Sequence, residues 1–117
     1  MASSIPQRYI DGLNSADVNA VSELFSQDSQ FLGGDGSKRV GRKAIHDFYA
    51  NVFANRKTLK TSLGRVIDEG RRVAFEVIVH DSPMGANGQA NSLDLVELDD
   101  DGLIAHKVVF YPQTRVK

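Results

Sequence analysis

The sequence predicts one α+β domain in which three N-terminal helices pack on a curved, mostly antiparallel sheet. Apolar residues recur with the helical period up to about residue 55, whereas from about residue 58 onward they alternate with polar residues, as in half-buried strands. Helices followed by strands are typical of domains whose helices cover one face of the sheet. Because 117 residues suffice for a single core, we expect one domain over residues 1–117.

The composition excludes several classes of function. A formal net charge of −1 with scattered Lys and Arg residues argues against nucleic-acid binding. The chain has no cysteine, no apolar run of membrane-spanning length and no signal-peptide pattern at residues 1–4. We therefore expect a soluble cytoplasmic protein with no membrane partner, no metal site and no cofactor.

The first helix is predicted from Ser4 to about Asn14. Ser4 and Gln7 form a capping box, and apolar residues recur every four positions around Tyr9. Tyr9 is therefore expected in the buried stripe of this helix, where its hydroxyl needs a partner.

A second helix is predicted after Asp17, which is a favourable N-cap residue. Val18, Val21, Leu24 and Phe25 form its apolar stripe, so the helix should run to about residue 26. Beyond it, an apolar pair at residues 31–32 indicates at most a short strand, and the glycine-rich residues 33–37 indicate a turn.

Gly41 precedes a third predicted helix with a broad apolar face. Phe48 and Tyr49 both lie on that face. Tyr49 is thus a second tyrosine whose hydroxyl must find a partner inside the protein.

Four strands are predicted in the C-terminal half, at residues 58–67, 71–80, 92–98 and 103–111. In the second of these, Val77 and Val79 share one face. Turn sequences separate the strands, so we expect a four-stranded antiparallel meander. The aspartate run at residues 99–101 belongs to such a turn, because it lacks the further ligands of a calcium-binding loop.

The strand at residues 92–98 places one carboxyl group, that of Asp94, on the same face as apolar neighbours. An ionised carboxylate in an apolar interior is costly, so Asp94 should be either paired or neutral. On the last strand, Lys107 or His106 is a candidate to point inward, but an outward lysine is the ordinary expectation.

A curved sheet with helices over its concave side encloses an apolar interior, which is the usual place for a small-molecule site. The convex side would expose apolar residues that need cover, and a twofold homodimer is the usual solution. These residues are Ile78, Leu93, Leu95 and Val108.

Three groups of residues resemble the bacterial ketosteroid isomerases, a family within the larger group of cone-shaped, nuclear transport factor 2-like (NTF2-like) and SnoaL-like proteins. The resemblance covers about residues 5 to 111, with small length changes near residues 38–39 and 55–64. The matching residues are Gln7-Arg8-Tyr9, Leu13-Asn14, Asp17, Leu24-Phe25, Gly41, Ala44-Ile45, Phe48-Tyr49-Ala50-Asn51 and Leu93-Asp94.

The resemblance implies a role for each matching polar residue. Tyr9 and a protonated Asp94 would donate hydrogen bonds to the 3-keto oxygen of a steroid, and Tyr49 would support Tyr9 through its hydroxyl. A carboxylic acid kept neutral by an apolar site is the known example of this family. The implied reaction is an allylic isomerisation through a dienolate, with no cofactor.

The family's proton acceptor, an aspartate, corresponds to Gly33 in this sequence, and glycine cannot accept a proton. Asp35 lies two residues further along the glycine-rich turn and is a candidate replacement, with Asp81 as a weaker one. Alternatively, the reaction needs no base at this position, the protein binds a ligand without turnover, or the base has been removed by engineering.

We favour a steroid delta-isomerase-like enzyme that acts on a steroid-like apolar ketone. The expected site comprises Tyr9, Asp94 and Asp35 as catalytic residues, with Tyr49, Gly33, Phe48, Val77 and Val79 in binding or supporting roles. The alternatives are a protein that binds a small apolar ligand without catalysis and a polyketide cyclase-like enzyme.

Overall fold

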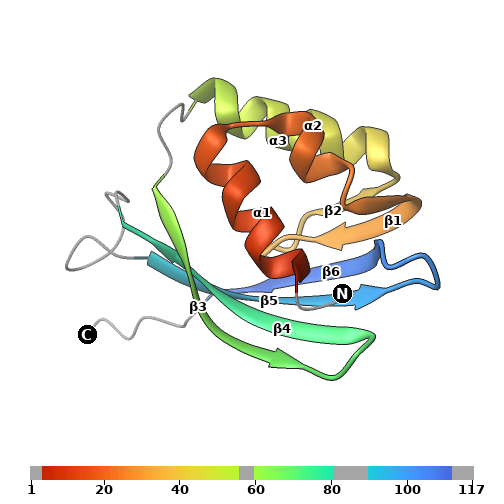
Figure 1. Cartoon of the computed structure of the whole chain (residues 1–117). Helices are drawn as coiled ribbons and strands as arrows, with labels where there is room; N and C mark the ends of the chain where they lie inside the picture. The colour runs from red at the N-terminus through yellow and green to blue at the C-terminus, as the bar shows by residue number, and fades with distance from the viewer. Residues whose placement is uncertain (1–3, 56–59, 81–89, 112–117) are drawn as a thin grey trace.

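The protein consists of three helices packed on one face of a curved sheet, as predicted, and the sheet has six strands (Figure 1). The computed structural model describes residues 4–55, 60–80 and 90–111. The helices are α1 (Ser4–Ser15), α2 (Val18–Ser22) and α3 (Arg42–Asn55), and the strands are β1 (Phe25–Leu32), β2 (Lys38–Val40), β3 (Thr61–Asp68), β4 (Arg72–Val79), β5 (Ala90–Leu98) and β6 (Ile104–Phe110).

The strand order across the sheet is β2-β1-β6-β5-β4-β3. Strands β3 to β6 form the predicted antiparallel meander. The N-terminal strand β1 joins it by pairing in parallel with β6 and antiparallel with β2. The sheet is therefore larger than predicted, because β2 was not expected and β1 has 8 residues where a short strand at most was expected near residues 31–32. The last strand, β6, lies near the middle of the sheet rather than at an edge.

The prediction for the second helix is wrong in its length. Asp17 caps α2 as expected, accepting a hydrogen bond from the Ala20 amide at 3.0 Å, but the helix ends at Ser22. Phe25 instead begins β1 opposite Ile104, whose amide donates to the Leu24 carbonyl at 2.7 Å. Leu24 and Phe25 are buried in either arrangement, so the apolar pattern alone could not distinguish a helix from a strand here.

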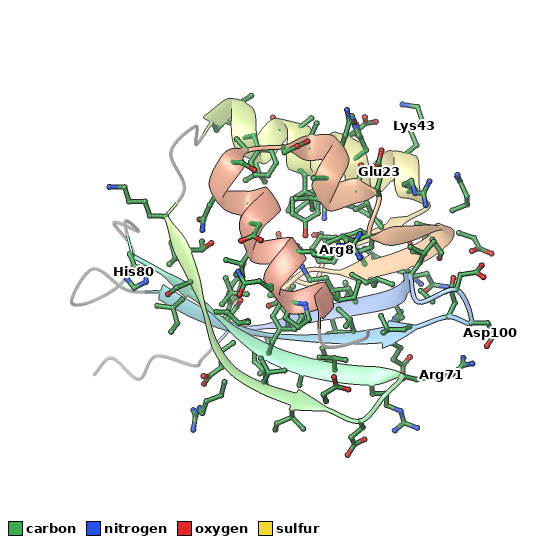
Figure 2. The ribbon with its side chains drawn as sticks, in the orientation of Figure 1. Arg8, Glu23, Lys43, Arg71, His80 and Asp100 are labelled. Atoms are coloured by element: carbon green, nitrogen blue, oxygen red, sulfur yellow. The ribbon has the colours of Figure 1, made fainter. Side chains whose placement is uncertain are left out.

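The predicted third helix and the predicted turns near residues 33–37, 68–70 and 99–102 are confirmed, whereas the predicted loop at residues 82–88 lies outside the described residues. Gly41 has a φ of +96°, which only glycine adopts without strain, and α3 begins at the next residue. Figure 2 shows Arg71 and Asp100 at the same end of the sheet, where an ion pair joins the β3–β4 turn to the β5–β6 turn.

The core lies between the helices and the inner face of the sheet. On β4, Val73, Phe75 and Val77 are buried on that face, with Val79 partly buried beside them. On β5, Asp94 and Val96 share the same side. The alternation that placed Val77, Val79 and Asp94 on inner faces is therefore confirmed.

The part of the chain that the structure describes contains no helix long and apolar enough to cross a membrane.

Candidate functional site

Two tyrosines from different helices meet inside the core. The apolar stripe of α1 directs Tyr9 toward the sheet, and that of α3 directs Tyr49 toward the same point. Their hydroxyl oxygens lie 2.7 Å apart, within hydrogen-bonding distance, and both residues are buried. The contact that the sequence resemblance implied between these two hydroxyls is therefore present.

A lysine from β6 completes this contact. The Lys107 ammonium nitrogen lies 2.6 Å from the Tyr9 hydroxyl oxygen and 3.0 Å from that of Tyr49. The Lys107 side chain has an exposed fraction of 0%. The ordinary expectation of an outward lysine is therefore wrong at this position.

An irregularity in β6 explains why Lys107 points inward. Glu97 pairs with His106, but the next residue of β5, Leu98, pairs with Ile104, so Ala105 is an extra residue in β6. A bulge of this kind shifts the alternation of side chains by one residue. Ile104 and Lys107 consequently both face inward, three residues apart, which strict alternation does not allow.

Asp94 on β5 provides the opposite charge. Its Oδ2 atom lies 3.1 Å from the Lys107 nitrogen, and its Oδ1 atom accepts a hydrogen bond from the Ser92 hydroxyl at 2.8 Å. Lys107 pairs with Val96 across the two strands, two residues from Asp94, so the ion pair is a diagonal neighbour contact. Of the paired and neutral states open to Asp94, the structure thus contains the paired one.

We call Tyr9, Tyr49, Asp94 and Lys107 the buried polar cluster. Burial raises the pKa of Tyr9 well above its ordinary value, and the neighbouring Tyr49 and Asp94 raise it further. Burial by itself lowers the pKa of Lys107, but the Asp94 carboxylate and Tyr49 outweigh this effect, so that the pKa of Lys107 lies above its ordinary value. The cluster therefore combines neutral Tyr9 with a charged ammonium at neutral pH.

Aromatic rings surround the ammonium group. Its nitrogen lies 3.8 Å from the centre of the Tyr9 ring and 4.9 Å from that of Phe31. Phe31 stacks on Tyr49 at 6.0 Å, and Phe48 contacts Tyr49 edge-on at 5.0 Å. A desolvated cation gains from the faces of such rings, which partly offsets the cost of burying it.

Gly33 and Asp35 lie outside the buried polar cluster, in the turn between β1 and β2. Asp35 is exposed, and its Oδ1 atom accepts hydrogen bonds from the Ser37 amide at 2.9 Å and the Ser37 hydroxyl at 2.7 Å. These bonds, the side-chain one first, lower the pKa of Asp35. A side chain at Gly33 would begin 3.1 Å from Asp35 Oδ1, so this carboxylate does lie beside the position of the family's base.

The remaining expected residues are distributed around the cluster. Phe48 packs on Tyr49 from α3, and Val77 and Val79 lie on the inner face of β4. Asp81, the weaker candidate base, lies outside the described residues.

Sequence reasoning missed the role of Lys107 and also the position of Tyr111. The Tyr111 ring lies so close to Gly34 that a methyl group there would overlap it. Partial burial raises the pKa of Tyr111, as does the charge of Asp94. The only signal for Lys107 was a lysine beside His106 within a strand that is otherwise apolar, since the bulge that turns Lys107 inward has no sequence signature.

Among the described residues, no group of three or more His, Cys, Asp or Glu side chains could hold a metal ion.

A curved six-stranded sheet with three helices on one face matches the cone-shaped fold of NTF2-like proteins. The sequence profile of the SnoaL-like domain matches residues 7–107, and the chain belongs to this family.

Solved structures with the same fold have low sequence identity to this chain. A SnoaL-like protein of unknown function from Burkholderia thailandensis is 12% identical, with a TM-score of 0.81 over 96% of this chain and 94% of the other. A Catenulispora acidiphila protein with a ketosteroid isomerase-like fold, solved with trimethylamine, is 18% identical, with a TM-score of 0.78 over 92% and 84%.

The epoxide hydrolase/cyclase-like enzyme SalBIII, which has a role in pyran ring formation in salinomycin, is 21% identical, with a TM-score of 0.77 over 96% of this chain and 91% of the other. No curated protein matches the sequence significantly. These similarities establish the fold, and the assignment of a reaction depends on the site.

Replacing Lys107 should destabilise the protein strongly. We expect Lys107→Met to lower the free energy of unfolding by about 3–5 kcal/mol, because the Asp94 carboxylate would remain buried without its counter-ion. Adding Asp94→Asn to this variant should recover part of the loss, since the charge is then removed. Urea denaturation of both single variants and the double variant measures the coupling.

Lys43→Met is the matched control, since the Lys43–Asp47 pair at 3.2 Å is solvent-exposed. The free energy of unfolding of Lys43→Met should equal that of the native protein. The losses in free energy of unfolding measured for the two single variants at positions 107 and 94 could instead add up in the double variant. Such additivity would show that the two charges are not coupled.

Stability should fall at alkaline pH. The folded-state pKa values of Tyr9 and Lys107 are both raised, so both groups contribute stability in full below their unfolded values of about 10 to 10.4. That contribution is lost as the pH rises through the folded values. We expect the free energy of unfolding to decline above about pH 10, and less steeply in Tyr9→Phe. The free energy of unfolding is measured by urea denaturation at a series of pH values. An equal decline with pH in the native protein and in Tyr9→Phe would contradict this prediction.

Proposed function

We propose that this protein binds a small apolar ketone, such as a steroid, and stabilises the enolate that forms when a proton leaves the carbon next to the carbonyl group. The observation that carries the proposal is the buried Tyr9–Tyr49 pair in contact with the Lys107 ammonium. A phenol hydroxyl donates a hydrogen bond to a ketone oxygen, and the ammonium compensates the negative charge that this oxygen acquires.

The electrostatic surroundings support this proposal. The side chains of the buried polar cluster are held in place by hydrogen bonds and by the aromatic rings around them, so they need little reorganisation during a reaction. Preorganised donors in a dry site are usually the largest contribution to catalysis of this kind, with about 3–4 kcal/mol lost when one donor is removed. The resemblance to ketosteroid isomerases points to the same reaction class.

A protein that binds the ketone without turning it over is the second candidate. It is favoured by Gly33, which leaves the usual position of the base without an acceptor, and by the low pKa of the exposed Asp35 carboxylate. A base of low pKa removes protons poorly. The two candidates share the ligand-binding role of the buried polar cluster and differ only in the proton acceptor.

A homodimer is proposed as the functional assembly. The outer face of the sheet carries neighbouring apolar side chains, because Leu93 pairs with Phe110 and Leu95 with Val108 across β5 and β6. Leu93 is 42% exposed and Phe110 is 50% exposed. A contiguous apolar surface of this kind is typical of a subunit interface.

Removal of the Tyr9 hydroxyl should impair both binding and turnover. In Tyr9→Phe we expect conversion of a β,γ-unsaturated 3-keto steroid to its conjugated enone, followed by ultraviolet absorbance, to slow by about 10²–10³-fold, because an oxyanion donor is lost. The same variant should bind a phenolic steroid analogue more weakly, which tests the site even without turnover. Lys43→Met serves as the control with unchanged binding and rate.

Failure of the native protein to bind either steroid would contradict the proposal. Binding without conversion would favour the second candidate. Conversion by Tyr9→Phe at the native rate would show that this tyrosine does not contact the ketone.

A charge on the outer face of the sheet should separate the proposed subunits. Leu93→Glu is expected to sediment as a monomer, whereas Val66→Glu should keep the native state. Val66 is a suitable control because it is similarly exposed, at 39%, but pairs with Phe75, whose side chain lies on the inner face. A native protein that sediments as a monomer would contradict the dimer.

A further inference from the structure

We propose that Asp94 is the proton acceptor of this site and that Lys107 is a counter-ion shared by Asp94 and the enolate oxygen of the ligand. The inference rests on the proposed function and gives Asp94 the opposite role to the donor role that the family resemblance implies. It follows from the number of hydrogen-bond donors and acceptors in the buried polar cluster.

The Lys107 ammonium has no hydrogen left for a ligand. An ammonium group has three N–H donors and no acceptor. Three acceptors surround it, namely Asp94 Oδ2 at 3.1 Å and the hydroxyl oxygens of Tyr9 at 2.6 Å and Tyr49 at 3.0 Å. Lys107 can therefore act on a ligand through its charge, but not through a direct hydrogen bond unless it gives up a partner.

The two tyrosines have one hydroxyl hydrogen to spare. Because both oxygens accept from Lys107, both hydroxyl hydrogens must point elsewhere. One of them forms the 2.7 Å bond between the two hydroxyls. Within the described part of the chain, the other hydrogen has no acceptor assigned to it, so the pair can donate one hydrogen bond to a ligand oxygen.

Asp94 has acceptor capacity to spare. A carboxylate offers about four lone-pair positions. Within residues 4–55, 60–80 and 90–111, two donors occupy them, the Ser92 hydroxyl on Oδ1 and Lys107 on Oδ2. In an ion pair with the ammonium the carboxylate only accepts hydrogen bonds, because it carries no hydrogen to donate.

The complementary ligand therefore presents an acceptor to the tyrosine pair and an acidic hydrogen to Asp94. A ketone with hydrogen on the neighbouring carbon meets both requirements. In the proposed step the C–H bond breaks and its proton forms an O–H bond with Asp94. The electron pair of the C–H bond forms the C=C bond of the enolate, and the carbonyl π electrons move to the oxygen. Return of the proton to a different carbon completes an isomerisation.

The shared counter-ion makes this step electrostatically favourable. Before the transfer, Lys107 compensates the Asp94 carboxylate at 3.1 Å. After the transfer, the negative charge lies on the enolate oxygen, which accepts a hydrogen bond from a tyrosine hydroxyl. That hydroxyl is itself in contact with the Lys107 ammonium. The charge therefore moves from one neighbour of the ammonium to another without leaving its field, and the net charge of the site is unchanged.

Asp35 is the rival acceptor. Its carboxylate lies beside Gly33, but it is exposed to solvent and accepts two hydrogen bonds from Ser37 through one oxygen. Both Asp35 and Asp94 accept stabilising contacts, so these contacts do not distinguish them as bases, and their positions relative to the tyrosine pair do. Asp94 shares the buried interior with both tyrosines, whereas the Asp35 carboxylate lies at the surface in the β1–β2 turn.

The test measures exchange of the α-hydrogens of 2-decalone, a saturated bicyclic ketone, in deuterium oxide by NMR. Exchange needs a base and an enolate but no isomerisation. We expect Asp94→Asn to slow the enzyme-dependent exchange by about 10²–10⁴-fold, as for loss of a general base. Because an asparagine amide still donates hydrogen bonds, little change would be expected if Asp94 acted as a donor. A loss confined to Asp35→Asn would overturn the proposal.

Two serine variants provide a matched pair in case Asp94→Asn does not fold. Ser92→Ala removes the side-chain donor from Asp94, and Ser37→Ala removes the side-chain donor from Asp35. Loss of a donor destabilises a carboxylate, so the acid limb of the pH–rate profile should move to higher pH in Ser92→Ala and stay in place in Ser37→Ala. The reverse pattern would assign the proton transfer to Asp35.

Binding of the ketone is measured by ligand-observed NMR in the same samples. It separates the proposed function, binding of a ketone, from the proposed role of Asp94 as the proton acceptor. Binding without exchange in the native protein would overturn the role of Asp94 as a base and leave the ligand-binding role intact. An absence of binding would overturn both. Exchange that is lost in Asp94→Asn while binding persists would support both.

Discussion

A lysine ammonium group in the middle of the core is the constraint on which the rest of this structure depends. A charge without a partner in such a place costs about 3–5 kcal/mol, which is a large part of the stability of a small domain, so the elements around Lys107 supply compensation. Asp94 supplies the opposite charge, the two tyrosine hydroxyls accept the remaining hydrogens, and aromatic ring faces surround the group. The ion pair ties β5 to β6, and the hydroxyls tie α1 and α3 to both.

This arrangement links the fold to the chemistry of the site. The aromatic packing that holds Tyr49 against Phe31 and Phe48 also fixes the direction of its hydroxyl. Because Lys107 only donates hydrogen bonds, it fixes how the hydroxyls of Tyr9 and Tyr49 are oriented. The contacts that compensate the buried charge thus leave one hydroxyl donor and one carboxylate with free acceptor positions. Enolisation of a ketone requires these two groups. Buried polar groups of this kind are common where proteins act on ligands.

Most of the fold could be predicted from the sequence because its signals are local. The stripe containing Tyr9, the alternation around Asp94 and the glycine at position 41 each depend on a few neighbouring residues. The start of β1 could not be predicted, since Phe25 is stabilised there by pairing with Ile104, about 80 residues away in the chain. Long-range pairing of this kind overrides a local helical pattern.

The inward positions of Tyr9, Tyr49 and Asp94 could be predicted for the same reason and with the same limit. Tyr9, Tyr49 and Asp94 lie on regular helices or strands, so periodicity placed them inward. Lys107 follows an extra residue in β6, and one extra residue reverses the face of every side chain beyond it. The contact of Asp94 with a basic partner depends on this lysine and so could not be derived from the Asp94 strand alone.

The charge state of Asp94 is the property that decides between a proton acceptor and a donor at this position. Carbon NMR of the labelled native protein, with the Asp94 carboxyl signal assigned by its absence in Asp94→Asn, reports whether the group is ionised near neutral pH. We expect a carboxylate signal at pH 7, since Lys107 holds the charge in place. The signal of a neutral carboxylic acid at that pH would contradict the ion pair, and with it the proposed role of Asp94 as a proton acceptor.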